Sequence, residues 1–336
     1  MRLEPPGWWY GSRPLDRFAA ALLEPAGYLY GAAAKARFAL TSPYRSRLPV
    51  ICVGNFTVGG AGKTPLALAV ARLVRKMGHE PAFLIRGYGG RLTGPHRVDP
   101  AQDDPADVGD EALLLARAAP TVVARSRPAG AKAIDALGAS LIIMDDGFQN
   151  PSLVKDFTLV AVDGAAGIGN GRVFPAGPLR APLGFQIGHA QASVLIGGRG
   201  DGGAFLGGKI PAIKAELRAV GETGWLRSQP LLAFSGIGRP TKFFDTLREN
   251  GATLADAEAF PDHHTFSEAE ATALIRKAEK TGALLVTTEK DHVRMCAPSG
   301  PLADLKAAAR GLPIALVFAG DDGQRLRKLL FPILKH

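Results

Sequence analysis

A chain of 336 residues is long enough for two domains, because single hydrophobic cores tend to divide beyond about 250–300 residues. Hydrophobic residues make up 46% and charged residues 21%, which supplies packed cores and excludes an intrinsically disordered chain. The formal net charge of +9 favours an acidic partner, which can be nucleic acid, an anionic membrane surface or a phosphorylated substrate. We expect no nucleic-acid partner, since no basic tract with interleaved aromatics and no zinc-finger or RNP-like pattern occurs.

The two cysteines, Cys52 and Cys296, stand far apart, which fits a reducing compartment and excludes a disulfide framework or a cysteine metal site. The amino terminus lacks the charged start, apolar stretch and cleavage site of a secretion signal. No apolar run reaches the about 18 residues that can span a bilayer. We therefore expect a protein on the cytoplasmic side that is soluble or peripheral to the membrane.

Residues 1–48 form a segment rich in leucine, alanine and aromatic residues, and it opens on Trp8, Trp9 and Tyr10. We expect two short helices broken at Pro25, each with an apolar side and basic residues near its edge. This composition is typical of amphipathic helices that lie in a membrane interface. A helical pair that packs on the protein's own core has the same periodicity and remains an alternative.

Residues 49–215 alternate short apolar strands with stretches of helical periodicity. The expected strands are "PVICVG", "PAFLI", "TVVA", "SLIIMDD", "FTLVAVD" and "ASVLIG". Helices between successive strands imply a parallel sheet covered on both faces, because a parallel connection needs a crossover of a dozen or more residues. This first domain is therefore expected to be α/β.

Residues 216–336 repeat the alternation on a smaller scale. Strand patterns occur at "PLLAFSGIG", "ALLVTTEKD" and "LPIALVF", with helices near residues 240–250 and 267–281 and a last helix after the final strand. We expect a second, smaller α/β domain, with the boundary near residue 215.

The stretch "TVGGAGKTP" nearly matches the phosphate-binding loop G-x-x-x-x-G-K-[ST]. Gly62, Lys63 and Thr64 match the pattern, whereas Thr57 replaces its first glycine. The loop stands between a strand and a helix and keeps two central glycines, so it favours a P-loop NTPase-type domain over a glycine-rich turn with a surface lysine. The expected nucleotide contacts are Thr57, Gly59, Gly60, Ala61, Gly62, Lys63, Thr64 and Pro65.

Asp145 and Asp146 end the strand "SLIIMDD", at the edge where ligands of open α/β sheets bind. Together with the hydroxyl of Thr64 they predict a Mg²⁺ site. One aspartate can hold the metal or its water while the other faces the substrate, and the sequence leaves open which does which. An Asp-Asp-Gly at a strand end is also a common turn.

Eight motifs follow one another along the chain: "VGNFTVGGAGKTP", "RGYGG", "VGDEALLLA", "DDGFQN", "GNGRVFPAGPLRAP", "AFSGIGRPTKFF", "FPDHHTF" and "TTEKD". In this order they resemble the tetraacyldisaccharide 4'-kinase family, the lipid A kinases of Gram-negative bacteria. The resemblance runs from about Trp8 to the last strand. The phosphate loop of that family also lacks its first glycine, so Thr57 agrees with the resemblance.

The resemblance implies transfer of the ATP γ-phosphate, with Mg²⁺, to the 4'-hydroxyl of an acylated glucosamine disaccharide 1-phosphate in lipopolysaccharide biosynthesis. It implies a peripheral protein at the cytoplasmic face of the inner membrane, and we expect no obligate protein partner. The aspartate of the family's "GDE" motif and a histidine of its "DHH" motif correspond to Asp110 and His263, the expected base and its partner. Lys63 and Asp146 complete the expected catalytic set. Because His263 lies in the second domain, that domain would close over the site.

Two of these assignments have plainer alternatives. Asp110 opens a helix after Gly109, where the helix dipole favours an acid without any catalysis. His263 and its neighbour His264 can each be a solvated loop histidine.

Substrate or phosphate contacts are expected from arginines, which bind phosphate bidentately, and from an aromatic ring that packs on a sugar face. These residues are Arg86, Tyr88, Arg127, Gln149 and Arg180. Arginines at strand ends are also common on protein surfaces. "TTEKD", residues 287–291, belongs to the resemblance but receives no assigned chemistry.

Two positions depart from the family, which usually has His after "DDGFQ" and Glu after "GPLR". This chain has Asn150 and Ala181 there. The departures concern the metal shell and substrate preference more than the reaction itself.

Two other functions fit the loop and the strand-end aspartates. A membrane-associated P-loop ATPase switch predicts slow hydrolysis and nucleotide-dependent self-association. A P-loop kinase of a soluble metabolite has no use for the amino-terminal aromatics. A kinase of either kind predicts ATP turnover that depends on an acceptor.

Overall fold

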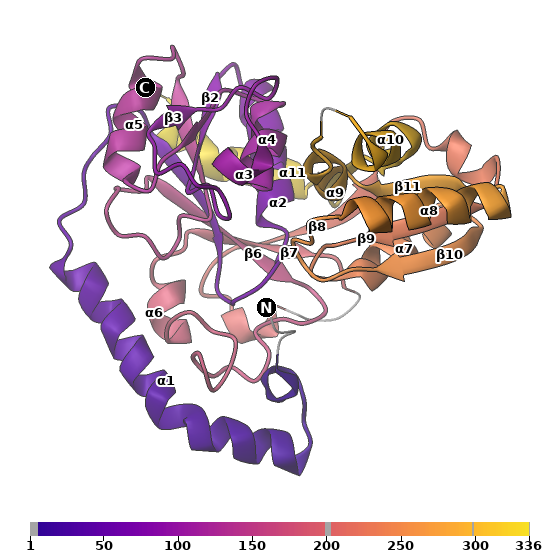
Figure 1. Cartoon of the computed structure of the whole chain (residues 1–336). Helices are drawn as coiled ribbons and strands as arrows, with labels where there is room; N and C mark the ends of the chain where they lie inside the picture. The colour runs from indigo at the N-terminus through magenta and orange to yellow at the C-terminus, as the bar shows by residue number, and fades with distance from the viewer. Residues whose placement is uncertain (1–5, 199–202, 298, 336) are drawn as a thin grey trace.

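The computed structural model describes residues 6–198, 203–297 and 299–335. Within this part of the chain the strands form two sheets (Figure 1). The larger sheet has nine described strands in the order β13-β8-β7-β6-β1-β5-β2-β4-β3. Their bounds are β1 (Val50–Asn55), β2 (Pro81–Ile85), β3 (His96–Arg97), β4 (Thr121–Val123), β5 (Leu141–Asp145), β6 (Phe157–Asp163), β7 (Ala192–Ile196), β8 (Ala212–Ala219) and β13 (Ile314–Phe318).

Neighbouring strands of the larger sheet run parallel, except that β3 is antiparallel to β4 and β13 is antiparallel to β8. Helices α2, α4 and α11 contribute to the core on one face, and α5 and α6 to the core on the other. The helices of this unit are α2 (Lys63–Arg75), α3 (Pro105–Val108), α4 (Asp110–Ala116), α5 (Arg127–Asp135), α6 (Leu183–Ile187) and α11 (Asp322–Leu330). The predicted parallel sheet covered on both faces is confirmed.

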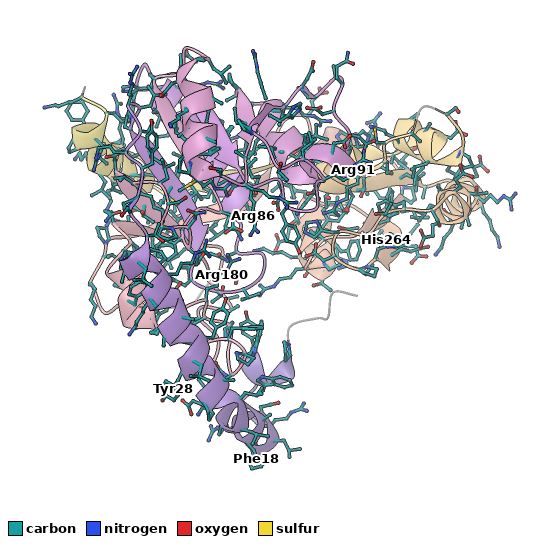
Figure 2. All side chains as sticks on the ribbon, turned by 60° about the vertical axis from the view of Figure 1, so that its left-hand side comes forward. Phe18, Tyr28, Arg86, Arg91, Arg180 and His264 are labelled. Atoms are coloured by element: carbon teal, nitrogen blue, oxygen red, sulfur yellow. The ribbon has the colours of Figure 1, made fainter. Side chains whose placement is uncertain are left out.

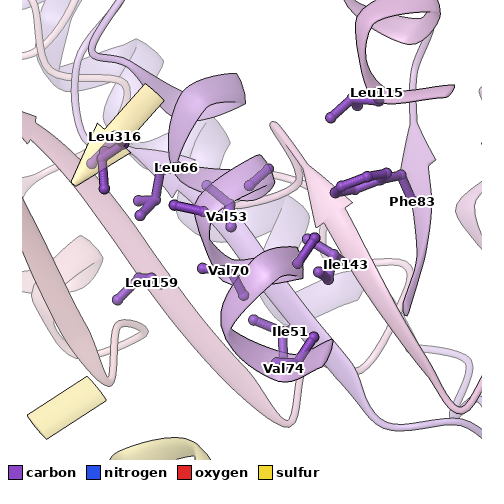
Figure 3. Packing of buried hydrophobic residues seen from close by; sticks show 14 of the residues in the cluster. Ile51, Val53, Leu66, Val70, Val74, Phe83, Leu115, Ile143, Leu159 and Leu316 are labelled. Atoms are coloured by element: carbon purple, nitrogen blue, oxygen red, sulfur yellow. The ribbon is translucent and has the colours of Figure 1, made fainter. Parts of the chain in front are cut away.

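β1 is buried along its whole length because it lies in the middle of the sheet between two layers of helices. Successive side chains of a strand point to opposite faces. Ile51 and Val53 therefore pack in the same core as Leu66 of α2 (Figure 3), whereas Val50 and Cys52 pack in the opposite core. Each large apolar side chain buried in this way contributes about 1.5–3 kcal/mol. This packing holds the ends of β1 and α2, and hence the loop between them, in place.

The smaller sheet has four described strands, all parallel, in the order β10-β9-β11-β12. Its elements are β9 (Leu231–Ser235), α7 (Pro240–Glu249), β10 (Leu254–Ala259), α8 (Glu268–Thr281), β11 (Leu284–Thr288), α9 (Glu289–Arg294), α10 (Pro301–Ala308) and β12 (Arg310–Leu312). A capping box of Ser267 and Glu270 begins α8, and Gly282 in the left-handed conformation ends it. The predicted second, smaller α/β unit is confirmed.

β13 and α11 lie on the larger sheet, although the sequence predicts that residues 216–336 belong to the second domain. β13 pairs with β8 over five residues. At the start of α11, Asp322 accepts the backbone N–H of Lys214 in β8 at 2.7 Å. The prediction is wrong for this part because strand periodicity does not indicate which sheet edge a strand joins. β13 joins the larger sheet because it pairs with the edge of β8, which would otherwise have no partner strand.

α1 (Pro14–Leu40) is one helix of 27 residues, so the expected break at Pro25 is wrong. A proline inside a helix costs about 3 kcal/mol, because it lacks an N–H and crowds the preceding turn. Contacts on both sides of the proline offset this cost. Glu24 pairs with Arg172 at 3.2 Å, and Gly27 packs so closely that a Cβ there would lie 2.9 Å from a backbone oxygen of the loop before α6.

The remaining described helices are short 3₁₀ segments: η1 (Gly7–Trp9), η2 (Ala204–Leu206), η3 (Gly224–Arg227) and η4 (Phe331–Ile333). Among the described residues, α1 included, no helix combines the length and apolarity needed to cross a bilayer. Cys52 and Cys296 are free thiols, the first buried and the second exposed.

Candidate active site

The loop between β1 and α2 adopts a conformation suited to an anion. Its positive φ angles fall on Gly59 (111°) and Gly62 (82°), where glycine is tolerated without strain. Thr57 is outside the positive-φ region and forms a bridge with Leu179, so a glycine is not required there. The Asn55 amide donates to the carbonyl oxygens of Thr57 at 2.7 Å and Gly59 at 3.1 Å, which fixes the entry to the loop.

Lys63 and Thr64, the first residues of α2, reach the two strand-end aspartates. The hydroxyl of Thr64 donates to Oδ2 of Asp145 at 2.9 Å. Nζ of Lys63 lies 3.8 Å from Oδ2 of Asp146 and 3.5 Å from the carbonyl oxygen of Gly59. The phosphate loop and the aspartates that the sequence pairs with it are therefore in direct contact.

Asp145 has the features of a metal ligand. It is 1% exposed, and its Oδ1 is buried without a hydrogen-bond partner among the described residues. Burial raises the pKa of Asp145 to about 7, and the negative charges of Glu111 and Asp146 act in the same direction. A buried carboxyl group with an unused oxygen beside a hydroxyl fits a hard cation such as Mg²⁺.

The described residues hold no group of three His, Cys, Asp or Glu side chains suited to a metal ion. Magnesium in phosphate-transfer sites usually takes only one or two carboxylates and completes its octahedron with phosphate oxygens and water. A site made from Thr64, Asp145 and Asp146 therefore has the ligand types that this ion uses.

Asp146 has a left-handed backbone, with φ of 50°, which is uncommon for a residue with a side chain. Its Oδ1 accepts from Nη1 of Arg180 at 3.2 Å. Arg180 also donates from Nε to the carbonyl oxygen of Thr57 at 3.0 Å and from Nη1 to Gln149 at 3.1 Å. These bonds join the phosphate loop, the strand-end acid and the chain before α6.

Asp110 and His263 meet where α4 of the larger unit lies against the smaller unit. Asp110 begins α4, is 5% exposed, and accepts the backbone N–H of Glu111 at 2.9 Å. Its Oδ2 lies 3.3 Å from Nδ1 of His263, which follows β10. His263 has φ of 59° and donates its backbone N–H to the carbonyl oxygen of Gly236 at 2.9 Å. The pair that the family resemblance implies is thus formed from two parts of the chain.

Cations surround Asp110. Burial alone would raise its pKa, but the hydrogen bond with His263 and the charges of Lys290 and Arg294 bring the pKa well below its usual range. Nε of Arg294 donates to Oδ2 of Asp110 at 2.7 Å. Nζ of Lys290 lies 3.9 Å from the same oxygen and donates to Glu111 at 2.9 Å.

Lys290 and Arg294 are residues of the site that the sequence does not predict. Lys290 belongs to the motif "TTEKD" and Arg294 follows it on the same short helix, α9. The motif is a signal that could have indicated them, since it has no other assigned role.

A cavity of about 230 Å³ lies beside the Asp146 site, between α1 and α6. Gln149 and Arg180, two of the five residues expected to contact substrate, are in its wall. The rest of the wall is largely apolar and consists of Tyr30, Ala33, Ala34, Arg37, Phe38, Phe148, Ala181, Phe185, Gln186 and His189.

The other three expected substrate residues lie outside this wall. The Tyr88 ring is 6.0 Å from the imidazole of His263. Arg86 is exposed after β2, and it is labelled in Figure 2. Arg127 is only 2% exposed and donates to the carbonyl oxygen of Ala124 at 2.7 Å. Contact between these side chains and a substrate stays a prediction.

The two departures from the family have local structural roles. Oδ1 of Asn150 accepts from the backbone N–H of Ser152 at 2.9 Å and from its hydroxyl at 2.7 Å, so Asn150 closes a turn. Ala181 is buried and lines the cavity, and its carbonyl oxygen accepts from Gln186 at 2.8 Å.

A central parallel strand, a glycine loop with Lys63 and Thr64, and an aspartate pair on the adjacent strand define the class of this chain as a P-loop protein. A family model described as tetraacyldisaccharide-1-P 4'-kinase matches residues 19–331. The chain belongs to this family.

Two relatives illustrate the similarity. A protein of Methylobacterium nodulans named tetraacyldisaccharide 4'-kinase is 52% identical over 98% of this chain and 96% of its own length. A protein of Rhodospirillum centenum with the same name is 45% identical over 99% of this chain and 97% of its own length.

The fold is also similar to a crystal structure of LpxK from Aquifex aeolicus in complex with ATP. The TM-score is 0.73 and the identity 24%, over 94% of this chain and 99% of that one. The similarity therefore extends over both sheets.

Proposed function

We propose that this chain transfers the γ-phosphate of ATP to the 4'-hydroxyl of an acylated glucosamine disaccharide 1-phosphate, a step of lipopolysaccharide biosynthesis. The names of its full-length relatives support the reaction. The structural observation that carries the proposal is the pairing of Asp110 in the larger unit with His263 in the smaller unit. A P-loop ATPase that acted only as a switch would not need this pair.

The phosphate loop binds the nucleotide in this proposal. Its backbone N–H groups and Lys63 hold the β- and γ-phosphates, and the amino terminus of α2 faces them. Thr64, Asp145 and Asp146 would hold Mg²⁺, which neutralises negative charge on the phosphates. Arg180 keeps Asp146 directed toward the loop.

Asp110 receives the sugar hydroxyl. A carboxylate with a lowered pKa is ionised at neutral pH, so it can accept the hydroxyl's hydrogen bond and align its oxygen with the γ-phosphorus. Because the transition state of phosphoryl transfer is loose, alignment contributes more than strong basicity. The hydroxyl proton passes to Asp110 as the new oxygen–phosphorus bond forms and the bond from the γ-phosphorus to the β,γ-bridging oxygen breaks, so that ADP leaves. His263 orients the carboxylate.

The outer side of α1 supports a location at the membrane surface. Four large apolar side chains repeat at helical spacing on it: Leu15 (80% exposed), Phe18 (69%), Leu22 (71%) and Leu29 (75%). The inner side bears small residues such as Gly27 that pack on the protein. Figure 2 shows Phe18 and Tyr28 directed away from the body of the molecule. We infer a peripheral attachment to the cytoplasmic face of the inner membrane.

The cavity between α1 and α6 is a suitable place for part of the acylated substrate. It is mainly apolar, it adjoins the helix with the exposed apolar side, and Gln149 and Arg180 connect it to Asp146. A lipid that entered from a bilayer along α1 would bring its polar end toward the phosphate loop.

The reaction is tested with γ-labelled ATP, Mg²⁺ and a detergent-solubilised tetraacyl disaccharide 1-phosphate. We expect label in the lipid after chromatography. Hydrolysis without labelled lipid would favour the ATPase switch, and the absence of both hydrolysis and labelled lipid would favour a kinase of a soluble metabolite that the mixture does not contain. Both results contradict the proposal.

Membrane attachment is tested by flotation with vesicles that contain anionic lipid. We expect a double variant, Phe18→Ser with Leu22→Ser, to bind at least about tenfold more weakly, because each buried CH₂ group contributes about 0.8 kcal/mol. Phe331→Ser is the control, since Phe331 is a large apolar side chain that is 51% exposed but follows α11, far from α1 in Figure 1. Equal loss in both variants would contradict a membrane role for α1.

A further inference from the structure

Arg294 makes more polar contacts in the proposed site than the reaction scheme above requires. It ends α9 in the smaller unit, and its side chain is 7% exposed. The guanidinium donates to Asp110 from Nε at 2.7 Å and to Asp291 from Nη1 at 2.7 Å. Nη1 also donates to the carbonyl oxygen of Gly236 at 2.6 Å, and Nη2 lies 3.2 Å from Nδ1 of His263.

The smaller unit holds Arg294 in place through Asp291, which is fully buried. Oδ2 of Asp291 accepts from the hydroxyls of Ser235 at 3.0 Å and Thr288 at 2.7 Å, and from the backbone N–H of Gly236 at 3.1 Å. These donors belong to the ends of β9 and β11. The orientation of the guanidinium is therefore set by the smaller sheet before any contact with Asp110.

The carbonyl oxygen of Gly236 connects Arg294 to His263 a second time. It accepts both Nη1 of Arg294 and the backbone N–H of His263. His263 is thus located through its backbone as well as its ring, in a left-handed conformation that an ordinary loop residue seldom adopts.

We propose that Arg294 is a positioning residue, whose guanidinium holds Asp110 of the larger unit and His263 of the smaller unit at their mutual distance. This inference rests on the proposed function, because it concerns the same transfer. An arginine suits the role since its planar fork presents five donors in fixed directions, whereas a lysine is a single point charge. The catalytic pair then forms only when the two units are in contact.

The charges around Asp110 agree with this role. His263, Lys290 and Arg294 face its carboxylate and account for its lowered pKa against the effect of burial. Each of these three cationic or titratable side chains also contacts a second acid. Arg294 donates to Asp291 and Lys290 donates to Glu111, while Nε2 of His263 lies 3.7 Å from Oδ1 of Asp262. Loss of the guanidinium would remove both a cation and the alignment that it imposes.

The test compares Arg294→Gln and Arg294→Lys with the wild-type chain, at full length and per mole of folded protein determined by thermal unfolding. In the glutamine variant we expect kcat for the lipid to fall about 10²-fold, because small misplacements of reacting groups have effects of that size. The acidic limb of its kcat/KM profile should move to higher pH. In the lysine variant kcat should fall about tenfold, while the acidic limb stays near its wild-type position because the charge remains.

KM for ATP should remain unchanged in both variants, since the phosphate loop belongs to the other unit. Arg91→Gln is the matched control: Arg91 pairs with Asp107 at 2.6 Å shortly before α4, but its side chain is 76% exposed. This control should keep the wild-type kcat and pH profile.

Two results would overturn the inference while the wild-type chain transfers phosphate to the lipid. The first is a folded Arg294→Gln variant with wild-type kcat and pH profile. The second is a raised KM for lipid at unchanged kcat, which would make Arg294 a substrate contact. Absence of transfer by the wild-type chain would instead overturn the proposed function, and this inference with it.

Discussion

Asp145 and Asp110 are both buried carboxyl groups at the proposed site, yet their surroundings are opposite. Asp145 has a hydroxyl, one lysine at a distance and two acids near it, and its pKa is raised to about 7. Asp110 has a histidine, a lysine and an arginine around it, and its pKa is lowered. Burial acts in the same direction on both, so the neighbouring charges decide the difference.

The comparison indicates two different uses for the same side chain. The charge of Asp110 is already compensated by cations of the protein. The charge of Asp145 is compensated only in part, by Lys63 and the Thr64 hydroxyl, and an incoming divalent cation can supply the rest. Two carboxyl groups whose environments push their pKa values apart are a common mark of divided roles in enzymes.

The largest loss of activity is expected at the phosphate loop, which lies beside Asp145 and which we call the nucleotide side of the site. Lys63→Ala removes the cation beside Asp146 that we propose holds the phosphates, so transfer should fall by about 10³–10⁵-fold. The measurement is label transfer to lipid under saturating ATP. A loss below tenfold would mean that the loop does not stabilise the transferred phosphate.

The second-largest loss of activity is expected at Asp110, on the side of the site that we propose receives the sugar hydroxyl (the acceptor side). Asp110→Asn keeps the shape of the side chain but cannot take the hydroxyl proton, so kcat should fall about 10²–10⁴-fold. The dissociation constant of ATP, measured by fluorescence of a labelled nucleotide, should change little. Weaker ATP binding at unchanged kcat would remove Asp110 from the acceptor side and break the comparison.

In metal-free protein, substitutions of Asp145 and Asp110 should change the free energy of unfolding in opposite directions. Asp145→Asn should raise the free energy of unfolding by about 2–4 kcal/mol at pH 8, at about 1.4 kcal/mol per unit of pKa shift. The folded pKa of Asp145 is raised, so the wild-type chain loses stability as the pH rises from about 4 toward 7. The gain of the variant should therefore be small near pH 4.

Asp110→Asn should act in the opposite direction. The folded pKa of Asp110 is lowered, so its contribution is complete above its unfolded pKa of about 4 and is lost only at lower pH. The variant leaves Arg294 and Lys290 without their carboxylate and should lose about 1–3 kcal/mol at every pH from 6 to 8. Denaturant unfolding in EDTA measures both variants, and shifts of the same sign would contradict the comparison.

The smallest effect is expected from Glu111, whose charge reaches Asp145 while its carboxylate pairs with Lys290. In metal-free protein, Glu111→Gln should reduce the loss of stability between pH 4 and 7 by under about 1 kcal/mol. The expected effect is small because interactions between partly exposed charges usually contribute no more than that. The same denaturant titrations measure it. A shift of that loss to higher pH would show that Glu111 does not act on Asp145.

The nucleotide side of the site could be predicted from the sequence because it is local. Lys63 and Thr64 follow a buried strand within one short loop, and Asp145 ends a later apolar strand that the sequence also predicts. The acceptor side depends on contacts between residues far apart in the chain. Arg294 meets Asp110 across a sequence separation of 184 residues, and no local pattern indicates such a contact.

The two errors in the fold have the same origin. Pro25 weakens a helix locally, but Glu24 and Gly27 gain contacts with a loop more than a hundred residues away. Residues 314–318 read correctly as a strand, yet their partner strand lies before the whole smaller unit. Periodicity predicts the element, whereas tertiary partners decide its length and its sheet.

The pairing of β13 with β8 also bears on how the chain is made. The ribosome synthesises β8 first and then residues 220–313, so the edge of β8 stays unpaired in the nascent chain during that interval. An unpaired edge can template association with other chains. Rapid folding of the intervening unit would shorten the reach that β13 must cover when it emerges, and slow folding there would prolong the exposure to aggregation.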